Sequence, residues 1–168
     1  AIPLDTNRDW PKREPRPFKN PDGGYTVSAY DNVSTPWGST HEESVRALKK
    51  SDHVSGMYIW TGFDYLGEPT PYTWPARSSY FGIIDLAGFP KDVYYLYQSE
   101  CTDKPVLHIY PHWNWKKGGT VDVVAYYNKA DEVELFLNGK SLGTRAKGKD
   151  GLHINWRVAF EAGTLKAV

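Results

Sequence analysis

The spacing of apolar residues along the chain predicts two kinds of structure in succession. Up to about residue 102, stripes with helical spacing flank one nearly continuous apolar run, which is the pattern of an α/β fold. After residue 103, short segments of alternating apolar and polar residues are separated by turns, which is typical of antiparallel β-structure. We therefore predict two domains, formed by residues 1–102 and residues 103–168.

The first part of the chain is expected to contain two helices and one buried strand. Ser39 or Thr40, followed by two acidic residues, predicts a helix N-terminus, and apolar positions continue that helix to about Ser51. A second helix is predicted over residues 91–100. Residues 54–60 are almost continuously apolar, which favours a strand buried on both faces of a parallel sheet. Irregular or short extended structure is expected elsewhere, at residues 1–24, 27–30 and 82–86.

The second part of the chain is expected to be entirely β-structure. Asn138 and Gly139 form the strongest two-residue hairpin signal in the sequence. Strands are predicted on both sides of this turn and beyond it, at residues 106–110, 120–127, 132–137, 140–146, 153–160 and 164–168. Regular short strands with turns between them predict an Ig-like β-sandwich, and the strand pattern suggests that this sandwich is incomplete within the chain.

Composition and charge exclude several classes of protein. The 168 residues include 20 Lys and Arg against 20 Asp and Glu, and this zero net charge argues against a nucleic-acid or anionic-membrane partner. No apolar run reaches the ~18 residues of a transmembrane helix, and residues 1–24 lack the apolar core of a signal peptide. The single cysteine, Cys101, excludes an internal disulfide framework and a cysteine-based zinc site. We expect no cofactor and no metal.

The aromatic content of the chain points to a possible carbohydrate site. The sequence has 7 Trp, 12 Tyr and 6 Phe, which is 15% of all residues. Many of them lie in residues 60–85, together with Asp, Glu, Arg and Ser. Flat rings can stack on the C–H face of a sugar, while polar neighbours bind its hydroxyls. The residues alone leave a second reading open, in which the rings are core residues and the acids are solvated.

The motifs of this segment resemble those of a known enzyme family. Residues 60–72 read W-T-G-F-D-Y-L-G-E-P-T-P-Y, and residues 78–92 read S-S-Y-F-G-I-I-D-L-A-G-F-P-K-D. Both are similar to the end of the catalytic barrel in glycoside hydrolase family 2, in particular its Bacteroides-type β-galactosidases. Residues 133–143 resemble a hairpin of the Ig-like domain that follows this barrel. The resemblance implies the C-terminal end of a (β/α)₈ barrel before an Ig-like sandwich.

The resemblance also implies a set of substrate-binding residues. Trp60 matches the tryptophan of the eighth barrel strand, which forms part of the floor of the sugar pocket. Asp64 and Tyr65 follow it, and each could bind a sugar hydroxyl or fix the loop. Glu68 is a further candidate in the same loop. Arg77 could bind substrate or form a salt bridge across the loop.

Two departures from the family pattern indicate which sugar the enzyme accepts and whether this chain carries catalytic residues. Related β-glucuronidases carry Asn-x-Lys where this chain has Ser79, Tyr80 and Phe81, so a substrate carboxylate would lack its cation. A neutral sugar, a β-galactoside in particular, is therefore expected. The family's two catalytic glutamates, one in an Asn-Glu pair, have no match here. We expect no catalytic residue in this chain, which would depend on the rest of the barrel upstream and be inactive alone.

Two alternatives and the compartment stay open at this point. The chain could be a binding or structural module without catalysis, with Trp113 or Trp115 stacking on a glycan. It could also belong to a family 2 enzyme for another neutral sugar, such as a mannoside. The family resemblance suggests a periplasmic or secreted protein, while composition fits any compartment.

Overall fold

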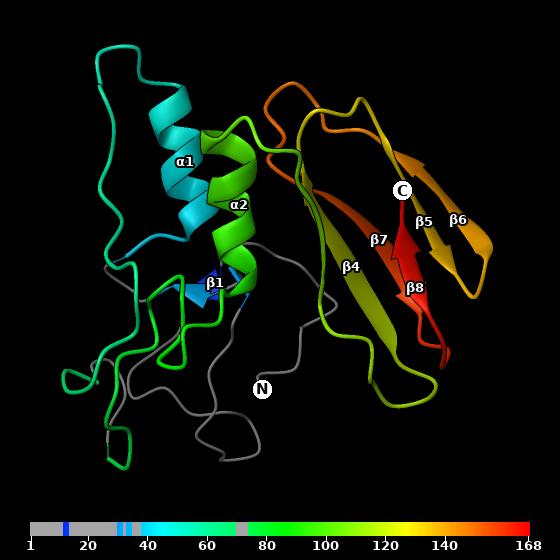
Figure 1. Cartoon of the computed structure of the whole chain (residues 1–168), viewed down its shortest axis with the longest axis horizontal. Coiled ribbons are helices and arrows are strands. Elements are labelled where there is room, and N and C mark those ends of the chain that lie inside the picture. Colours follow the sequence, from blue (N-terminus) through cyan, green and yellow to red (C-terminus); the bar gives the residue numbers. More distant parts are fainter. Residues whose placement is uncertain (1–11, 14–29, 32, 35–37, 70–73) are drawn as a thin grey trace. The chain divides into compact units, whose positions relative to one another are not determined.

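The computed structural model describes residues 12–13, 30–31, 33–34, 38–69 and 74–168 (Figure 1). Its described residues form two compact units, one up to Tyr94 and one from Tyr95 to Val168. The boundary between the two units falls inside helix α2 (Asp92–Cys101). The presence of this helix confirms the second predicted helix. Each unit is described by itself below.

Helix α1 (His41–Lys49) begins at a capping box, as the sequence predicts. The Thr40 hydroxyl accepts a hydrogen bond from the Glu43 amide at 3.3 Å, and the Thr40 amide donates to the Glu43 carboxylate at 2.7 Å. The buried carboxylate of Asp31 accepts from the amides of His41 and Glu42 at 2.8 and 2.7 Å. Amide donors that the first helical turn leaves free are thus satisfied by side chains.

The buried strand predicted at residues 54–60 is wrong. These residues have no regular structure and none of them is buried; the exposed fraction is 42% for Val54, 104% for Tyr58 and 74% for Trp60. A strand needs neighbouring backbone on its edges, and no strand in the described part of this unit pairs with residues 54–60. The hydrophobic pattern identifies apolar residues, but it does not show which strands would pair with them.

The remaining predictions for the first unit have mixed outcomes. Lys12–Arg13 (β1) and Val33–Ser34 (β2) pair in parallel, so a short strand lies inside the segment expected to be irregular. The extended segment expected at residues 27–30 lies outside the described residues, except for Tyr30. Residues 82–86 form no strand but contribute Ile84 to two isolated β-bridges.

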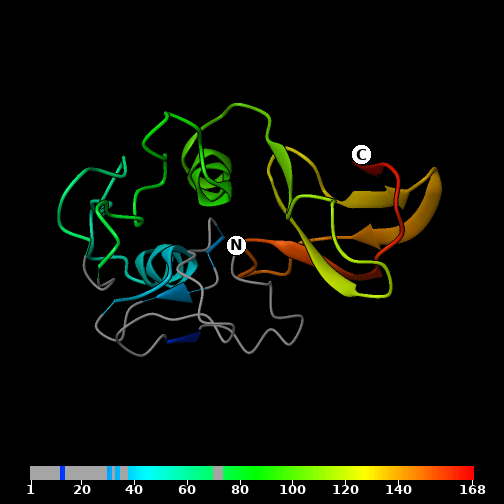
Figure 2. The same cartoon turned by 90° about the horizontal axis from the view of Figure 1, so that it is seen from below.

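The second unit contains two antiparallel three-stranded sheets, and all six predicted strands are present (Figures 1 and 2). The first sheet has the order β3-β4-β7, formed by Leu107–Tyr110, Thr120–Tyr127 and Ile154–Ala159. The second has the order β6-β5-β8, formed by Lys140–Arg145, Val133–Leu137 and Leu165–Ala167. The hairpin at Asn138 and Gly139 joins β5 to β6, with both residues at positive φ as its turn requires.

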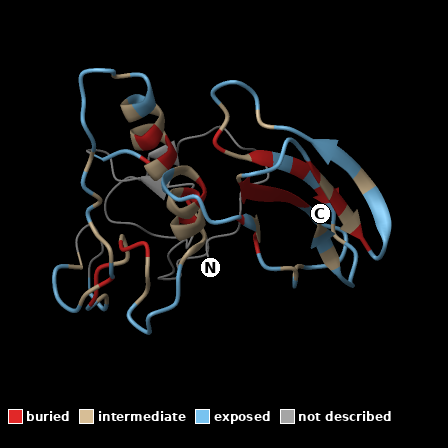
Figure 3. Ribbon diagram, turned by 45° about the horizontal axis from the view of Figure 1, so that its top comes forward, coloured by how far each residue is buried: buried red, intermediate tan, exposed pale blue. Residues whose placement is uncertain are grey.

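One hydrophobic core joins the two sheets. Val123 on β4, Leu135 on β5 and Trp156 on β7 are each 2% exposed or less and belong to the same cluster. Buried residues alternate with half-buried ones along β5 and with exposed ones along β7, as expected for strands with one face on a core (Figure 3). Strand β4 is buried on both faces, and even its charged residue Asp122 is buried. Both carboxylate oxygens of Asp122 accept hydrogen bonds from the Arg157 guanidinium, at 2.9 and 3.1 Å.

The C-terminal half of α2 is attached to the outer side of the β3-β4-β7 sheet. The Tyr95 ring stacks on the ring of His108 in β3, with 3.7 Å between their centroids. After β4, the Asn128 side-chain amide donates to the carbonyls of Ser99 and Lys104 at 3.2 and 3.0 Å. Its oxygen accepts from the Val106 amide at 2.8 Å. The end of the helix and the following connection are therefore hydrogen-bonded to the sheet.

Candidate functional site

The candidate site is built from two short segments that lie side by side, residues 61–67 and residues 77–84. They meet through isolated β-bridges, parallel between Phe63 and Ile84 and antiparallel between Leu66 and Ser78. Backbone hydrogen bonds of 2.8–3.1 Å run between the two segments on both sides of Asp64. The pairing thus changes direction near Asp64, where the second segment has to turn.

Asp64 and Lys91 form an ion pair at the point where the pairing changes direction. The Lys91 ammonium lies 2.9 and 2.8 Å from the two carboxylate oxygens of Asp64 and donates to the Tyr80 carbonyl at 2.8 Å. The Asp64 carboxylate also accepts from the Gly82 amide at 2.7 Å. Both side chains are largely buried, with 5% of Asp64 and 11% of Lys91 exposed. The observed contacts of Asp64 are those of a loop-fixing residue, one of its two expected roles.

Tyr65 and Glu68 form a polar pair at the surface of the same loop. The Tyr65 hydroxyl donates to the Glu68 carboxylate at 3.1 Å, and the Tyr65 ring meets Phe81 edge-on. Burial raises the pKa of the Tyr65 phenol, and the hydrogen bond to Glu68 raises it further. Glu68 follows Gly67 with both residues at positive φ, 37° and 85°, which turns the chain back at this point. The phenol therefore stays protonated and can act as a donor.

Exposed aromatic faces surround this polar pair in the sequence. Trp60 is exposed, and the peptide bond that follows it is cis. Trp74 is also exposed, and the Arg77 guanidinium lies over its ring at 5.0 Å. The salt bridge across the loop that was considered for Arg77 is not among the ion pairs of the described residues, so its contact is with a ring.

The structure also assigns residues that sequence reasoning missed. Ser79 is fully buried, and its hydroxyl accepts from the Tyr65 amide at 2.9 Å. Lys91 was expected only as the start of a helix, yet it reaches Asp64, 27 positions earlier. No signal in the sequence indicates this contact, because no periodic spacing relates Lys91 to Asp64.

The carboxylates of the loop are committed to other groups. A retaining glycosidase needs two carboxyl groups about 5–5.5 Å apart, one as acid/base and one as nucleophile. Asp64 is bound by Lys91 and Gly82, and Glu68 is bound by Tyr65. Among the described residues, these two loop carboxylates are therefore engaged by other groups, and exposed rings lie near them in the sequence.

Two buried titratable groups lie at the start of α1 in the same unit. Burial lowers the pKa of His41 from its usual 6.5 to about 4, and the charge of Lys91 lowers it further. Burial raises the pKa of Asp31 from 3.8 to about 7, although its hydrogen bonds from the Glu42 and His41 amides act in the opposite direction. The two groups therefore have opposite effects on stability at acidic pH.

We expect His41 to remain neutral at pH 5, and an NMR titration of its ring should give a pKa near 4. The unfolded chain binds this proton more readily, so His41 makes the fold less stable as pH falls from about 6.5 to about 4. Asp31 has the opposite effect, since its contribution is lost as pH rises from 3.8 to about 7. A His41 pKa near 6.5 would contradict the expectation.

The tryptophans considered as a sugar platform have structural contacts in the second unit. The Trp113 indole donates to the Glu161 carbonyl at 3.0 Å, and its ring packs on Phe160 and the edge of the core. The Trp115 indole donates to the His112 carbonyl at 2.7 Å, and the two rings stack 4.9 Å apart. These contacts favour packing as the role of Trp113.

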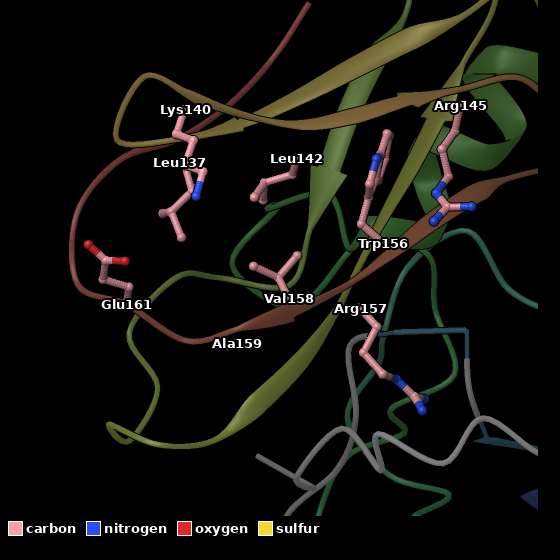
Figure 4. A pocket seen from close by; sticks show the side chains of 9 residues that line it. All are labelled: Leu137, Lys140, Leu142, Arg145, Trp156, Arg157, Val158, Ala159 and Glu161. Atoms are coloured by element: carbon pink, nitrogen blue, oxygen red, sulfur yellow. The ribbon is translucent and has the colours of Figure 1, made fainter.

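A cavity of about 320 Å³ lies between the edge strands β6 and β7 (Figure 4). Apolar side chains form its interior, among them Leu142, Trp156 and Val158, while Arg157 points away from it. Lys140 and Glu161 lie at one end of this cavity. Its lining lacks the combination of exposed rings and hydroxyl-binding groups found at residues 60–85.

Within the described residues, no three or more His, Cys, Asp or Glu side chains gather as a metal site. The described helices are too short or too polar to cross a membrane.

Comparisons with known proteins extend over both units. The profile of a domain of unknown function (DUF4982) matches residues 118–168. The chain is 60% identical over 167 residues to β-galactosidase BoGH2A of Bacteroides ovatus, which covers 99% of the chain and 19% of that protein. It is 43% identical over 147 residues to a putative β-glucuronidase of Formosa agariphila, covering 84% of the chain and 14% of that protein.

Solved structures show the same similarity. A β-glycosidase from Bacteroides vulgatus is 42% identical with a TM-score of 0.76, over 85% of the chain and 18% of the structure. A glycosyl hydrolase family 2 member from Bacteroides cellulosilyticus is 31% identical with a TM-score of 0.60, over 76% and 18%. The chain spans less than a fifth of the length of each of these four proteins.

Proposed function

The chain belongs to glycoside hydrolase family 2, and on that premise we propose that it works within a longer retaining hydrolase of terminal β-galactosides. Such a hydrolase forms a glycosyl-enzyme intermediate through an oxocarbenium-like transition state. In this proposal the chain supplies part of the sugar-binding wall, and the two catalytic glutamates come from elsewhere in the longer protein. The chain alone would then be inactive.

The exposed loop around Trp60 is the observation that carries the proposal. The Trp60 ring is exposed and could stack on the C–H face of a sugar. Exposure of a large apolar ring does not stabilise the fold, so a role in binding accounts for it better. Tyr65 and Glu68 offer a protonated hydroxyl and a carboxylate to sugar hydroxyls. Arg77, on the ring of Trp74, would line the edge of this wall. Asp64 would fix the loop from beneath.

A neutral sugar fits the charge of the loop better than an acidic one. Ser79, Tyr80 and Phe81 occupy the positions at which related β-glucuronidases bind the substrate carboxylate, and none of them is a cation. Lys91 reaches the Tyr80 carbonyl, but both oxygens of Asp64 neutralise its charge. Neither residues 79–81 nor the paired Lys91 would therefore supply a free positive charge to an acidic sugar.

The domain assignment is part of the same proposal. Residues 1–102 would form the C-terminal part of a (β/α)₈ barrel, and residues 103–168 would belong to an Ig-like sandwich. The two antiparallel sheets around one core support the second assignment. The pairing of residues 61–64 with residues 82–84, which includes a parallel bridge, is compatible with a barrel origin of the first.

The proposal is tested by hydrolysis of a chromogenic β-galactoside by the longer protein and by this chain alone. We expect turnover only by the longer protein, with little turnover of the matching β-glucuronide or β-mannoside. In the longer protein, Trp60→Ala should lower kcat/KM by about 30-fold, since a stacked aromatic face is worth about 2 kcal/mol.

Trp115→Ala is the matched control, because the same change is made at a ring held against His112 in the second unit. It should leave kcat/KM unchanged. A glycan-binding module without catalysis would give the reverse result, with sugar binding lost on Trp115→Ala or Trp113→Ala and kept on Trp60→Ala. Preferred turnover of a β-mannoside would retain the family and replace the substrate.

A further inference from the structure

We infer that Lys91 is a positioning residue for the sugar-binding wall, acting through the carboxylate of Asp64. The inference rests on the proposed function and extends it to a residue outside the exposed loop. The contact in question is the ion pair between Lys91 and Asp64. Asp64 lies between Trp60 and Tyr65 in the sequence, so the ion pair would hold both of these residues in place.

The first step of the argument is the backbone that the pair satisfies. Where the pairing of the two loop segments changes direction, the Gly82 amide donates to the Asp64 carboxylate at 2.7 Å. The Tyr80 carbonyl accepts from the Lys91 ammonium at 2.8 Å. The ion pair therefore replaces backbone hydrogen bonds at the point where the ladder cannot continue.

The second step is the geometry on either side of the pair. The carbonyls of Thr61 and Gly62 accept from the amides of Ile83 and Ile84 at 3.1 and 3.0 Å, directly after Trp60. On the other side, the Tyr65 amide is bound by Ser79. The Asp64 amide itself donates to Ile84 at 2.8 Å. The pair thus lies between the anchor of Trp60 and the anchor of Tyr65, and a shift of Asp64 moves both.

The third step is the fixed position of Lys91 itself. Its own amide donates to the Ile83 carbonyl at 2.9 Å, and α2 begins at the next residue. The backbone of Lys91 is therefore held while its side chain reaches across the loop. With only 11% of this side chain exposed, water cannot readily replace the Asp64 carboxylate, so removal of either partner leaves an uncompensated buried charge.

The test uses the longer enzyme with the single variants Lys91→Met, Lys91→Arg and Asp64→Asn, and the double variant Asp64→Asn/Lys91→Met. Misplacement of a substrate-binding wall should raise KM for a chromogenic β-galactoside by about tenfold or more, with kcat within about twofold. Lys91→Arg should restore most of the wild-type KM, because a guanidinium also binds a carboxylate. The double variant should be no worse than the poorer single variant, because both act through one contact.

Lys129→Met is the matched control, since its ion pair with Asp103 is exposed in the second unit, and it should leave KM and kcat unchanged. A merely structural role for Lys91 would lower the folded fraction and kcat with KM unchanged, and this result would overturn the inference. Unchanged kinetics in both Lys91→Met and Asp64→Asn would also overturn it. A wild-type enzyme without β-galactosidase activity would instead refute the proposed function, and the inference with it.

Discussion

Trp156→Ala is expected to lower the free energy of unfolding of the second unit by about 3–5 kcal/mol. The Trp156 side chain is 2% exposed and lies in the core that joins the two sheets. Its indole also donates to the Gly143 carbonyl at 2.9 Å, which links β7 in one sheet to β6 in the other. The substitution therefore removes a large buried volume and a hydrogen bond between the sheets.

Chemical unfolding of the variants, followed by circular dichroism, measures this effect. Trp156→Phe keeps most of the ring but loses the indole donor, so it should be less destabilising than Trp156→Ala by a clear margin. Trp74→Ala makes the same change at a ring that is 73% exposed and should stay within about 0.5 kcal/mol of the wild type. Equal losses for Trp156→Ala and Trp74→Ala would contradict the assigned core.

Gly82→Ala is expected to disrupt the sugar-binding loop and to lower kcat/KM of the longer enzyme by about a hundredfold. A Cβ atom at Gly82 would lie 2.2 Å from the Asp64 nitrogen and 2.3 Å from the Phe63 carbonyl carbon. These are backbone atoms, so they cannot move aside as a flexible side chain could. The two loop segments must separate, at a cost in stability of about 1–3 kcal/mol.

The same substitution at Gly56 provides the comparison, because a Cβ there meets no atom within 4 Å. Kinetics and thermal unfolding of both variants should be measured together. We expect Gly56→Ala to match the wild type in both. If Gly82→Ala retains wild-type kcat/KM, the close approach of the two segments is not required for sugar binding.

The β-structure was predictable because its determinants are local. Alternation along residues 133–137, followed by Asn138 and Gly139, specifies a strand and its turn without reference to the rest of the chain. Helix α1 was predictable for the same reason, since Thr40 and Glu43 carry its capping box within four residues. Local hydrogen bonds and periodicity therefore account for these elements.

Long-range contacts were not predictable from the same signals. Residues 54–60 have the composition of a buried strand, but burial depends on backbone and side chains that the pattern does not contain. Asp122 is a charged residue within the strand predicted at residues 120–127, yet it is fully buried against Arg157 from β7. The grip of Lys91 on Asp64 likewise depends on a fold that brings distant positions together.

The hydrogen bonds of Asn128 restrain the connection between α2 and β3. One side chain binds carbonyls on both sides of residues 102–103 and the amide of Val106, directly before β3. These hydrogen bonds restrain the connection, so the end of β4 is held to the end of α2 through Asn128 as well as through the covalent chain.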